Sequence, residues 1–493
     1  MPATASALTR FVILIVFSSV PLIFLAPQTS CYEFERRHSA KLRHFTAKID
    51  KIVSSSKPST IVRPPPQVGG VFYPVGYGAD PTGQNDSTDA IQKALNDAFQ
   101  QRSSDPNLKE ELIPGIKDLG GAVVDLQGGA YKISKPISFP PSGGGGLLVK
   151  DGSLRASRGF PADRFLVELL SPKSEVLIYK TDDVAAYQGK GIYYEDVRFK
   201  DVLFDSGFSG GGVLAVDTAR TQITNCYFLN FTTQGVLVQG GRDAFIQSCF
   251  LGQRPTVGGG VGEKDYSGTA IDLAGNDNVV TDAVIFSSAI GVVLRGQANM
   301  LRDIHTYNKE RIFGGIGILA RAFADYNRIT DCFVDYNSIV LEDPRFIQIT
   351  NSFFLGYANV VLKAVKGRLE ALSITDNFFR GIDMAPVVEL QGEFTEVRDV
   401  AVERNQAWNS TVKSTSAKTV LARKGTKWVA DFSKALLFPD KIEYFQYSFL
   451  VKKESSRMPI HAATAVAGNK VVVESEGVAD AVVSVVVDQC NPI

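Results

Sequence analysis

Acidic side chains in the middle of the chain are its strongest candidates for chemistry. Asp272 lies in the apolar stretch TAIDLAG, between Ile271 and Leu273. If this stretch is a strand that buries its two neighbours, Asp272 points to the opposite side, where a carboxylate has no packing role. A structural interpretation stays open, because Asp272 could also bond to a neighbouring turn as one member of a stacked row.

Three further carboxylates belong to the same part of the chain. The Gly-rich stretch GQRPTVGGGVGEKDYSG (252–268) contains Glu263 and Asp265, and the stretch VDYN contains Asp335. Two such groups cleave a glycosidic bond: one protonates the leaving oxygen and the other activates water, roughly 6.5–9.5 Å away when the configuration inverts. We therefore expect the catalytic carboxylates among these four, first Asp272 and Asp265, with Asp335 or Glu263 as alternatives.

Basic and aromatic side chains follow these carboxylates. Arg295 stands in GVVLRG, and the stretch HTYNKER contains His305, Tyr307, Lys309 and Arg311. Cations pair with the carboxylates of an anionic sugar chain. We therefore expect Arg295, Lys309 and Arg311, together with Tyr307, to bind substrate. His305 would orient or tune an acid. The alternatives are an ordinary exposed turn for the cations and a structural role for the histidine.

A repeat must bring these residues together. Eight short stretches, among them ITNCYF (223–228), ITDCFV (329–334) and ITDNFF (374–379), carry a small polar residue in the third place and recur at intervals of 20 to 34 residues. A second strand pattern, such as GVLVQG or GVVLRG, recurs between them. The polar residues are Asp201, Asn225, Ser248, Asp282, Asp303, Asp331, Asn351 and Asp376.

Short strands at a drifting period in the low twenties predict an all-β solenoid, a parallel β-helix. Coils stacked about 4.8 Å apart bury one continuous core and align like residues into rows. The polar row would lie at the strand ends, and Cys226 above Cys249 would point inward as structural residues. A leucine-rich repeat requires the pattern LxxLxLxxN, which this sequence lacks. We expect the β-helix over residues 69–410.

The stretch before the repeat predicts a cap. In DSTDAIQKALNDAFQ (86–100), Asp86 can cap a helix whose apolar residues fall on one face. Those residues are Ile91, Ala94, Leu95, Ala98 and Phe99. Such a helix can cover the first coil, which would otherwise expose backbone groups and core. For Asp80, Asp86 and Asp89 we favour turn and capping roles over metal binding.

The two ends of the chain differ from the repeat in composition. Arg10 precedes the apolar run FVILIVFSSVPLIFLA (11–26), which predicts a secretory signal peptide over residues 1–30, with a signal anchor as the alternative. Residues 31–68 are polar and then Pro-rich, as in a linker. Residues 411–493 predict a small β-rich C-terminal unit. Export is consistent with glycosylation sequons at Asn85, Asn230 and Asn409.

Cysteine and charge counts narrow the class of protein. Five cysteines without a CxxC pair argue against a zinc site, and an odd count in an exported protein leaves at least one thiol unpaired. Lys and Arg together number 52, as do Asp and Glu, so no basic surface for nucleic acid or anionic membrane is indicated. We expect a secreted monomer that uses no metal or other cofactor and does not contact a membrane after signal cleavage.

Two motifs resemble a known superfamily. FYPVGYGADPTGQNDSTDAIQKALNDA (72–98) is similar to the opening motif of the pectate-lyase-3 superfamily, through Gly78, Ala79, Asp80, Gly83, Asp89, Ala90, Ile91 and Ala94. GGAVVDLQGGAYKISKPISFP (120–140) resembles the next element, with Gln127 where that superfamily often has Pro. With its signal and C-terminal unit, the whole chain resembles the plant QUARTET-type polygalacturonases. The resemblance implies a right-handed β-helix and a secreted hydrolase of homogalacturonan in the plant cell wall.

The sequence departs from the main polygalacturonase family in its catalytic motifs. That family carries N-T-D, D-D, G-H-G and R-I-K on successive coils, whereas here the nearest fragments are Thr181-Asp182-Asp183 and Arg311-Ile312-Phe313. Catalytic residues therefore cannot be transferred by motif, because one scaffold carries several reactions. Two other functions remain open: a Ca²⁺-dependent pectate lyase, and a non-catalytic protein that binds pectin in the wall.

Overall fold

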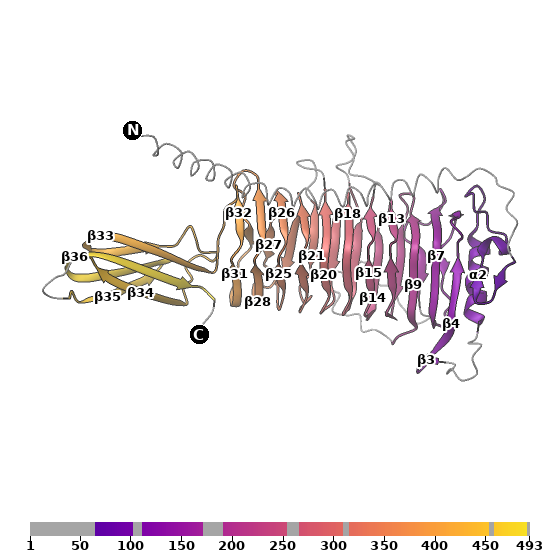
Figure 1. Ribbon diagram of the computed structural model, residues 1–493, viewed down its shortest axis with the longest axis horizontal. Coiled ribbons are helices and arrows are strands. Elements are labelled where there is room, and N and C mark those ends of the chain that lie inside the picture. The colour runs from indigo at the N-terminus through magenta and orange to yellow at the C-terminus, as the bar shows by residue number, and fades with distance from the viewer. Residues whose placement is uncertain are drawn as a thin grey trace, which may run out of the picture. The chain divides into compact units, whose positions relative to one another are not determined.

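A computed structural model describes residues 65–101, 111–170, 191–253, 266–308, 315–452 and 458–490. They form a right-handed parallel β-helix, as the repeat and the resemblance predict (Figure 1). The predicted signal peptide and most of the predicted linker lie outside the described residues. So do Glu263, Asp265, Lys309 and Arg311. Within the described ranges, no helix is long and apolar enough to cross a membrane.

Each coil passes through three faces of one continuous sheet. We call them the first, second and third face, in the order in which the chain passes through them. Strands of the first face pair in parallel from coil to coil. They are β8 Phe165–Leu169, β10 Gly211–Val216, β14 Gln234–Arg242, β17 Thr269–Asn276, β19 Ile290–Leu294, β21 Ile316–Ala320, β24 Ser338–Glu342, β27 Val360–Lys363 and β30 Val388–Gln391.

Within a coil, the strands of the second and third faces follow the first-face strand without a long connection between them. The second face holds β12 Gln222–Thr224, β15 Phe245–Gln247, β22 Arg328–Thr330, β25 Gln348–Thr350, β28 Arg368–Thr375 and β31 Glu396–Glu403. The third face holds β13 Tyr227–Leu229, β16 Phe250–Gly252, β23 Phe333–Asp335, β26 Phe353–Gly356, β29 Phe378–Gly381 and β32 Gln406–Trp408. Four longer strands bend through both faces: β7 Gly144–Ala156, β9 Tyr194–Asp205, β18 Val279–Phe286 and β20 Met300–Tyr307.

The row of polar residues predicted from the repeat forms the corner between the second and third faces. All eight members, from Asp201 (φ 57°) to Asp376 (φ 60°), have left-handed backbone conformations. Asn and Asp tolerate this conformation better than other side-chain-bearing residues, because their short polar groups bond to the local backbone. The row therefore reflects a one-residue turn repeated once per coil.

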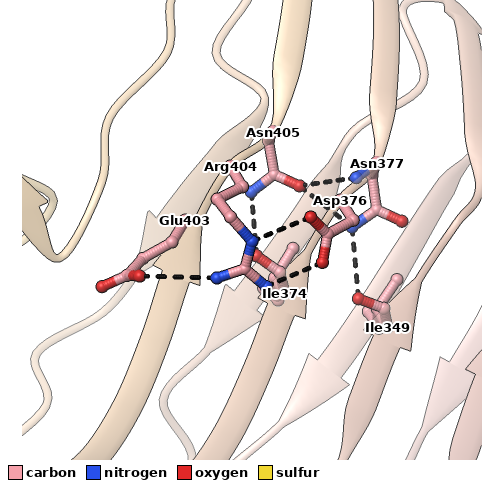
Figure 2. Close-up of polar contacts among 7 residues, drawn as sticks. All are labelled: Ile349, Ile374, Asp376, Asn377, Glu403, Arg404 and Asn405. Carbon is pink, nitrogen blue, oxygen red and sulfur yellow. Dashed lines mark hydrogen bonds and ion pairs between the residues drawn. The ribbon is translucent and has the colours of Figure 1, made fainter.

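Figure 2 shows this corner in the last two coils. Arg404 (φ 53°) occupies the corner above Asp376, and its guanidinium donates hydrogen bonds of 2.9 and 2.8 Å to the Asp376 carboxylate. The next residue of each coil points inward. Asn377 Nδ2 donates to Asn405 Oδ1 (3.0 Å) and to the Ile349 carbonyl (3.2 Å). This ladder satisfies backbone groups that the turn leaves without strand partners.

The same inward row holds the cysteines in earlier coils. Cys226 and Cys249 are buried at 0 and 2% exposure, as the stacking argument predicts, and Cys332 belongs to the row as well. Burial raises the pKa of the Cys249 and Cys332 thiols to about 12. These cysteines are packing residues of the core.

A helix covers the first coil. The helix α2, Thr88–Gln100, buries the predicted apolar face, and its Phe99 ring packs edge-on against Phe139 at 5.6 Å. Its N-cap residue is Ser87, while Asp86 Oδ1 accepts the Thr88 N–H at 3.0 Å. The other elements at this end are β1 Gln67–Val68, β2 Val71–Phe72, η1 Pro74–Tyr77, β3 Glu111–Ile113, β4 Ile116–Asp125, β5 Ala130–Ile133 and β6 Ile137–Ser138. A further short strand, β11 Thr218–Ala219, belongs to a later coil.

The last part of the chain forms a second, antiparallel sheet. Its strands are β33 Ser416–Asp431, β34 Tyr444–Val451, β35 His461–Ala467 and β36 Lys470–Asp488, with β36 at the centre. Trp428 and Val483 lie in its own apolar core. Leu437, Phe438 and Cys490 instead join the core of the β-helix.

Candidate functional site

The outward side of the third face carries a row of rings around His305 and Asp335. Register places Phe286, Tyr307 and Asp335 above one another in successive coils, with His305 and Phe333 in the adjacent row. The inward neighbours, such as Val334, fill the core. Strand alternation therefore turns His305, Tyr307 and Asp335 away from the core and onto one surface.

His305 and Asp335 are neighbours across two coils. His305 Nε2 lies 3.7 Å from Asp335 Oδ2, and the two side chains are 9 and 13% exposed. The imidazole sits edge-on between the rings of Phe286 (5.5 Å) and Phe333 (5.0 Å). These contacts fix the ring plane, so that the imidazole presents Nε2 to the carboxylate.

The second carboxylate oxygen of Asp335 is buried and accepts no hydrogen bond from the described residues. A buried carboxylate oxygen without a donor is costly and is often retained for a functional reason. Tyr307 and Tyr336 extend the aromatic surface beside it, with ring centroids 6.1 Å apart. A carboxylate with an oxygen left open, beside rings on which a sugar can stack, is chemically suited to acid–base work on a glycan.

Two segments outside the described residues, 254–265 and 309–314, begin at the ends of third-face strands next to this surface. The segment 254–265, which contains the predicted Glu263 and Asp265, follows Gln253, and the preceding residue Gly252 pairs with Phe286. Gln253 closes its base through a hydrogen bond from Nε2 to Ser267 Oγ at 2.8 Å and one from Ser267 N to Oε1 at 2.8 Å. The two ends of the connection are therefore held together, one after the third-face strand β16 and the other before the first-face strand β17.

The segment that contains Lys309 and Arg311 starts after Asn308. The Asn308 N–H donates to the Asp335 carbonyl at 3.4 Å. The chain thus enters this segment directly beside Asp335. Lys309 and Arg311 themselves lie outside the described residues.

Asp272 and Arg295 lie elsewhere, on the first face. Asp272 points away from the core, as predicted, yet it is fully buried, and Arg295 Nε lies 2.9 Å from its Oδ1 and 3.3 Å from its Oδ2. The Arg295 side chain is 8% exposed. A predicted catalytic carboxylate and a predicted substrate cation are therefore joined in one buried ion pair.

A second charged group lies on the first face. Arg321 and Lys363 both pair with Glu342, at 3.3 and 3.1 Å. Nearby, burial raises the pKa of Asp325, although its ion pair with Arg345 (3.1 Å) acts in the opposite direction. Asp325 lies in the corner RAFADYN, and the only sequence signal for it is the longer interval of the repeat there.

The sequons occupy different environments. Asn85 and Asn409 are exposed, whereas Asn230 is partly buried in a corner and donates from Nδ2 to Asp205 Oδ1 at 2.7 Å. Over the described ranges, no group of three or more His, Cys, Asp or Glu side chains is arranged to hold a metal ion.

No protein-family profile matches the chain. It is 42% identical over 463 residues to polygalacturonase QRT3 of Arabidopsis thaliana, a match that covers 92% of each chain.

Solved structures resemble the chain in architecture at low sequence identity. The Dettilon tailspike protein is 10% identical with a TM-score of 0.45, over 85% of this chain and 94% of the tailspike. The A-module of the Azotobacter vinelandii mannuronan C-5 epimerase AlgE6 is 11% identical with a TM-score of 0.41, over 69% of this chain and 98% of the module.

Proposed function

The chain belongs to the family of the Arabidopsis polygalacturonase QRT3, and on this premise we propose that it is a secreted polygalacturonase. It hydrolyses the α-1,4-galacturonan of pectin in the plant cell wall, by acid–base catalysis with carboxylates and without a metal cofactor. Cleavage of residues 1–30 releases the protein as a monomer, and Asn85, Asn230 and Asn409 are its candidate glycan sites. The family relationship supports the substrate, and the third face supports the chemistry.

The pair formed by His305 and Asp335 is the observation that carries the proposal. Asp335 is a carboxylate on an outward, ring-lined surface, with one oxygen that lacks a donor among the described residues. In this proposal Asp335 is one of the two catalytic carboxylates, and His305 positions it. Asp265 or Glu263 provides the other, from the connection whose base Gln253 and Ser267 close.

The reaction needs no further co-reactant. One carboxylic acid donates its proton to the glycosidic oxygen as the bond from that oxygen to the anomeric carbon breaks. The other carboxylate removes a proton from water, and the water oxygen bonds to the same carbon. Lys309, Arg311 and Tyr307 hold the uronate carboxylates, whose charge would otherwise oppose approach of the acidic site. Asp272, with Arg295, is the alternative carboxylate.

The test uses the purified mature protein on de-esterified polygalacturonate, with and without a chelator. Reducing ends and the ultraviolet absorbance of unsaturated products are followed in parallel. New reducing ends without absorbance, unaffected by chelator, are expected. Absorbance that a chelator abolishes would show a lyase, and binding without any new chain ends would show a wall-binding protein; either result overturns the proposal.

A further inference from the structure

The corner between the first and second faces carries an exposed aromatic surface, and the second face lies between it and the third face that carries His305 and Asp335. Phe323, Tyr326 and Phe346 are 47, 53 and 37% exposed. Tyr326 and Phe346 belong to consecutive coils, and their rings stack at 4.7 Å with an interplanar angle of 13°. The whole second face separates this corner from the third face along each coil. We refer to these three residues, with Arg345 and Lys366, as the aromatic corner.

The backbone at this corner is unfavourable for bulky residues. Phe323, Tyr326 and Phe346 have φ angles of 73°, 60° and 53°, in the left-handed region that large side chains rarely adopt. Other coils carry no aromatic residue at the same corner position, which holds Asp196, Arg220, Asp243, Asp277, Ala298, Ala371 and Asp399. Rings held outward in a strained conformation suggest a function at this position rather than a packing role.

Cations accompany the rings. Lys366 Nζ lies 4.5 Å from the centroid of Phe323, and Arg345 Cζ lies 5.9 Å from that of Phe346. Asp343 fixes the turn that carries the lysine, because its carboxylate accepts the N–H groups of Val365, Lys366 and Gly367 at 3.0, 2.6 and 3.1 Å. Among the described residues Lys366 forms no ion pair, so its ammonium is available to an outside anion.

We propose that the aromatic corner is a second binding site for an acidic polysaccharide, separate from the catalytic surface. A pyranose ring has an apolar C–H side that packs on an aromatic ring, and a uronate adds a carboxylate that pairs with a cation. The flat pair of Tyr326 and Phe346 provides the first contact and Lys366 the second. The corner thus holds a distant part of the polymer and raises the affinity of the enzyme for long chains. The identity of the polymer rests on the proposed function.

The test replaces the rings with a residue that the same corner already carries in other coils. Tyr326→Ala with Phe346→Ala, and Lys366→Gln separately, are compared with Phe208→Ala, a matched control with 50% exposure and φ 60° at another turn. Binding of the full mature protein to immobilised polygalacturonate is measured at low temperature, so that hydrolysis is slow. A neutral glucan is the second ligand. Hydrolysis of long polymer and of a short oligogalacturonate is measured in parallel.

We expect the ring variants to bind polygalacturonate about tenfold more weakly, which corresponds to about 1.4 kcal/mol, with a matching rise in KM for long polymer. The kcat on the short oligomer and the behaviour of Phe208→Ala should stay at wild-type values. Unchanged affinity, an equal loss of affinity for the neutral glucan, or a change in molecular mass in the ring variants would overturn the inference. A wild-type protein that neither binds nor hydrolyses polygalacturonate would instead refute the proposed function.

Discussion

His305 Nε2 lies 3.7 Å from Asp335 Oδ2, and this contact joins two adjacent coils on the outward side of the third face. Phe286 and Phe333 flank the imidazole edge-on and hold its plane. The histidine therefore acts on the carboxylate through position, and a substitution can separate this effect from packing.

His305→Phe keeps a ring between Phe286 and Phe333 but removes the nitrogen that faces Asp335. We expect kcat on polygalacturonate to fall roughly tenfold, the equivalent of one lost polar interaction of about 1.4 kcal/mol. KM should stay within a factor of about two, because no substrate contact is removed. Steady-state kinetics test this, with the unfolding midpoint as the structural measure. A lowered unfolding midpoint with an unchanged kcat would refute the positioning role.

Asp272→Asn tests whether the ion pair with Arg295 stabilises the fold or performs catalysis. Removing one partner of a buried pair leaves the other charge uncompensated, which lowers the free energy of unfolding by roughly 3–5 kcal/mol. Replacing both residues, as Asp272→Leu with Arg295→Met, should recover most of that loss, because apolar pairs of similar size are tolerated. Denaturant unfolding measures both variants. A stable Asp272→Asn protein with no hydrolysis would identify Asp272 as a catalytic carboxylate instead.

The turn that precedes helix α2 gives a prediction about acid stability. Partial burial alone would raise the pKa of Asp80, but hydrogen bonds from Thr82 and Asn85 outweigh it and lower the pKa from 3.8 to about 2. A carboxyl with a depressed folded-state pKa stabilises the protein above its ordinary pKa, and this stabilisation is lost as pH falls from about 4 to about 2.

Asp80→Asn should therefore lower the unfolding midpoint at neutral pH, and the difference from wild type should shrink between pH 4 and pH 2. Thermal unfolding across this range measures the effect, and Asp89→Asn, an exposed residue of the same segment, is the control. If the difference in unfolding midpoint between Asp80→Asn and wild type stays constant down to pH 2, the lowered pKa assigned to Asp80 is contradicted.

The asparagine ladder gives a prediction about the core. Asn377 is 1% exposed, accepts the Ser352 N–H at 3.0 Å and donates to Ile349 O and Asn405 Oδ1. Asn377→Ala leaves buried backbone groups without partners, at a cost of roughly 1–3 kcal/mol in the free energy of unfolding. Arg404→Ala, which removes the exposed pair with Asp376 in the same corner, should leave the unfolding midpoint nearly unchanged. Equal losses in the two variants would be inconsistent with this account.

Local sequence patterns predicted much of the fold, because each coil repeats the same physical problem. A polar residue recurs at the corner from Asp201 to Asp376 since only short polar side chains readily take its left-handed backbone. The inward stack of Cys226 and Cys249 follows from strand alternation. The exception is Arg404, whose corner position becomes visible only with its partner Asp376 in view.

The candidate site was harder to predict, because it depends on distances between coils rather than on order along the chain. Asp272 was correctly expected to point away from the core, but neither its complete burial nor its pairing with Arg295 follows from the pattern TAIDLAG. The contact between His305 and Asp335 spans an interval of 30 residues and depends on register. The aromatic corner was missed, because Tyr326 and Phe346 share one position of the repeat, three residues before Ile329 and Ile349, at which the other coils carry no aromatic residue.

The most direct measurement is the rate at which Asp335→Asn forms reducing ends from de-esterified polygalacturonate, next to wild type. The isosteric amide preserves shape but can neither donate nor accept the catalytic proton, so we predict a loss of roughly 10²–10⁴-fold in kcat. The unfolding midpoint should stay close to that of wild type, since Asp335 Oδ1 accepts no hydrogen bond from the described residues. A folded Asp335→Asn protein with wild-type kcat would place the catalytic carboxylates elsewhere and contradict the central claim.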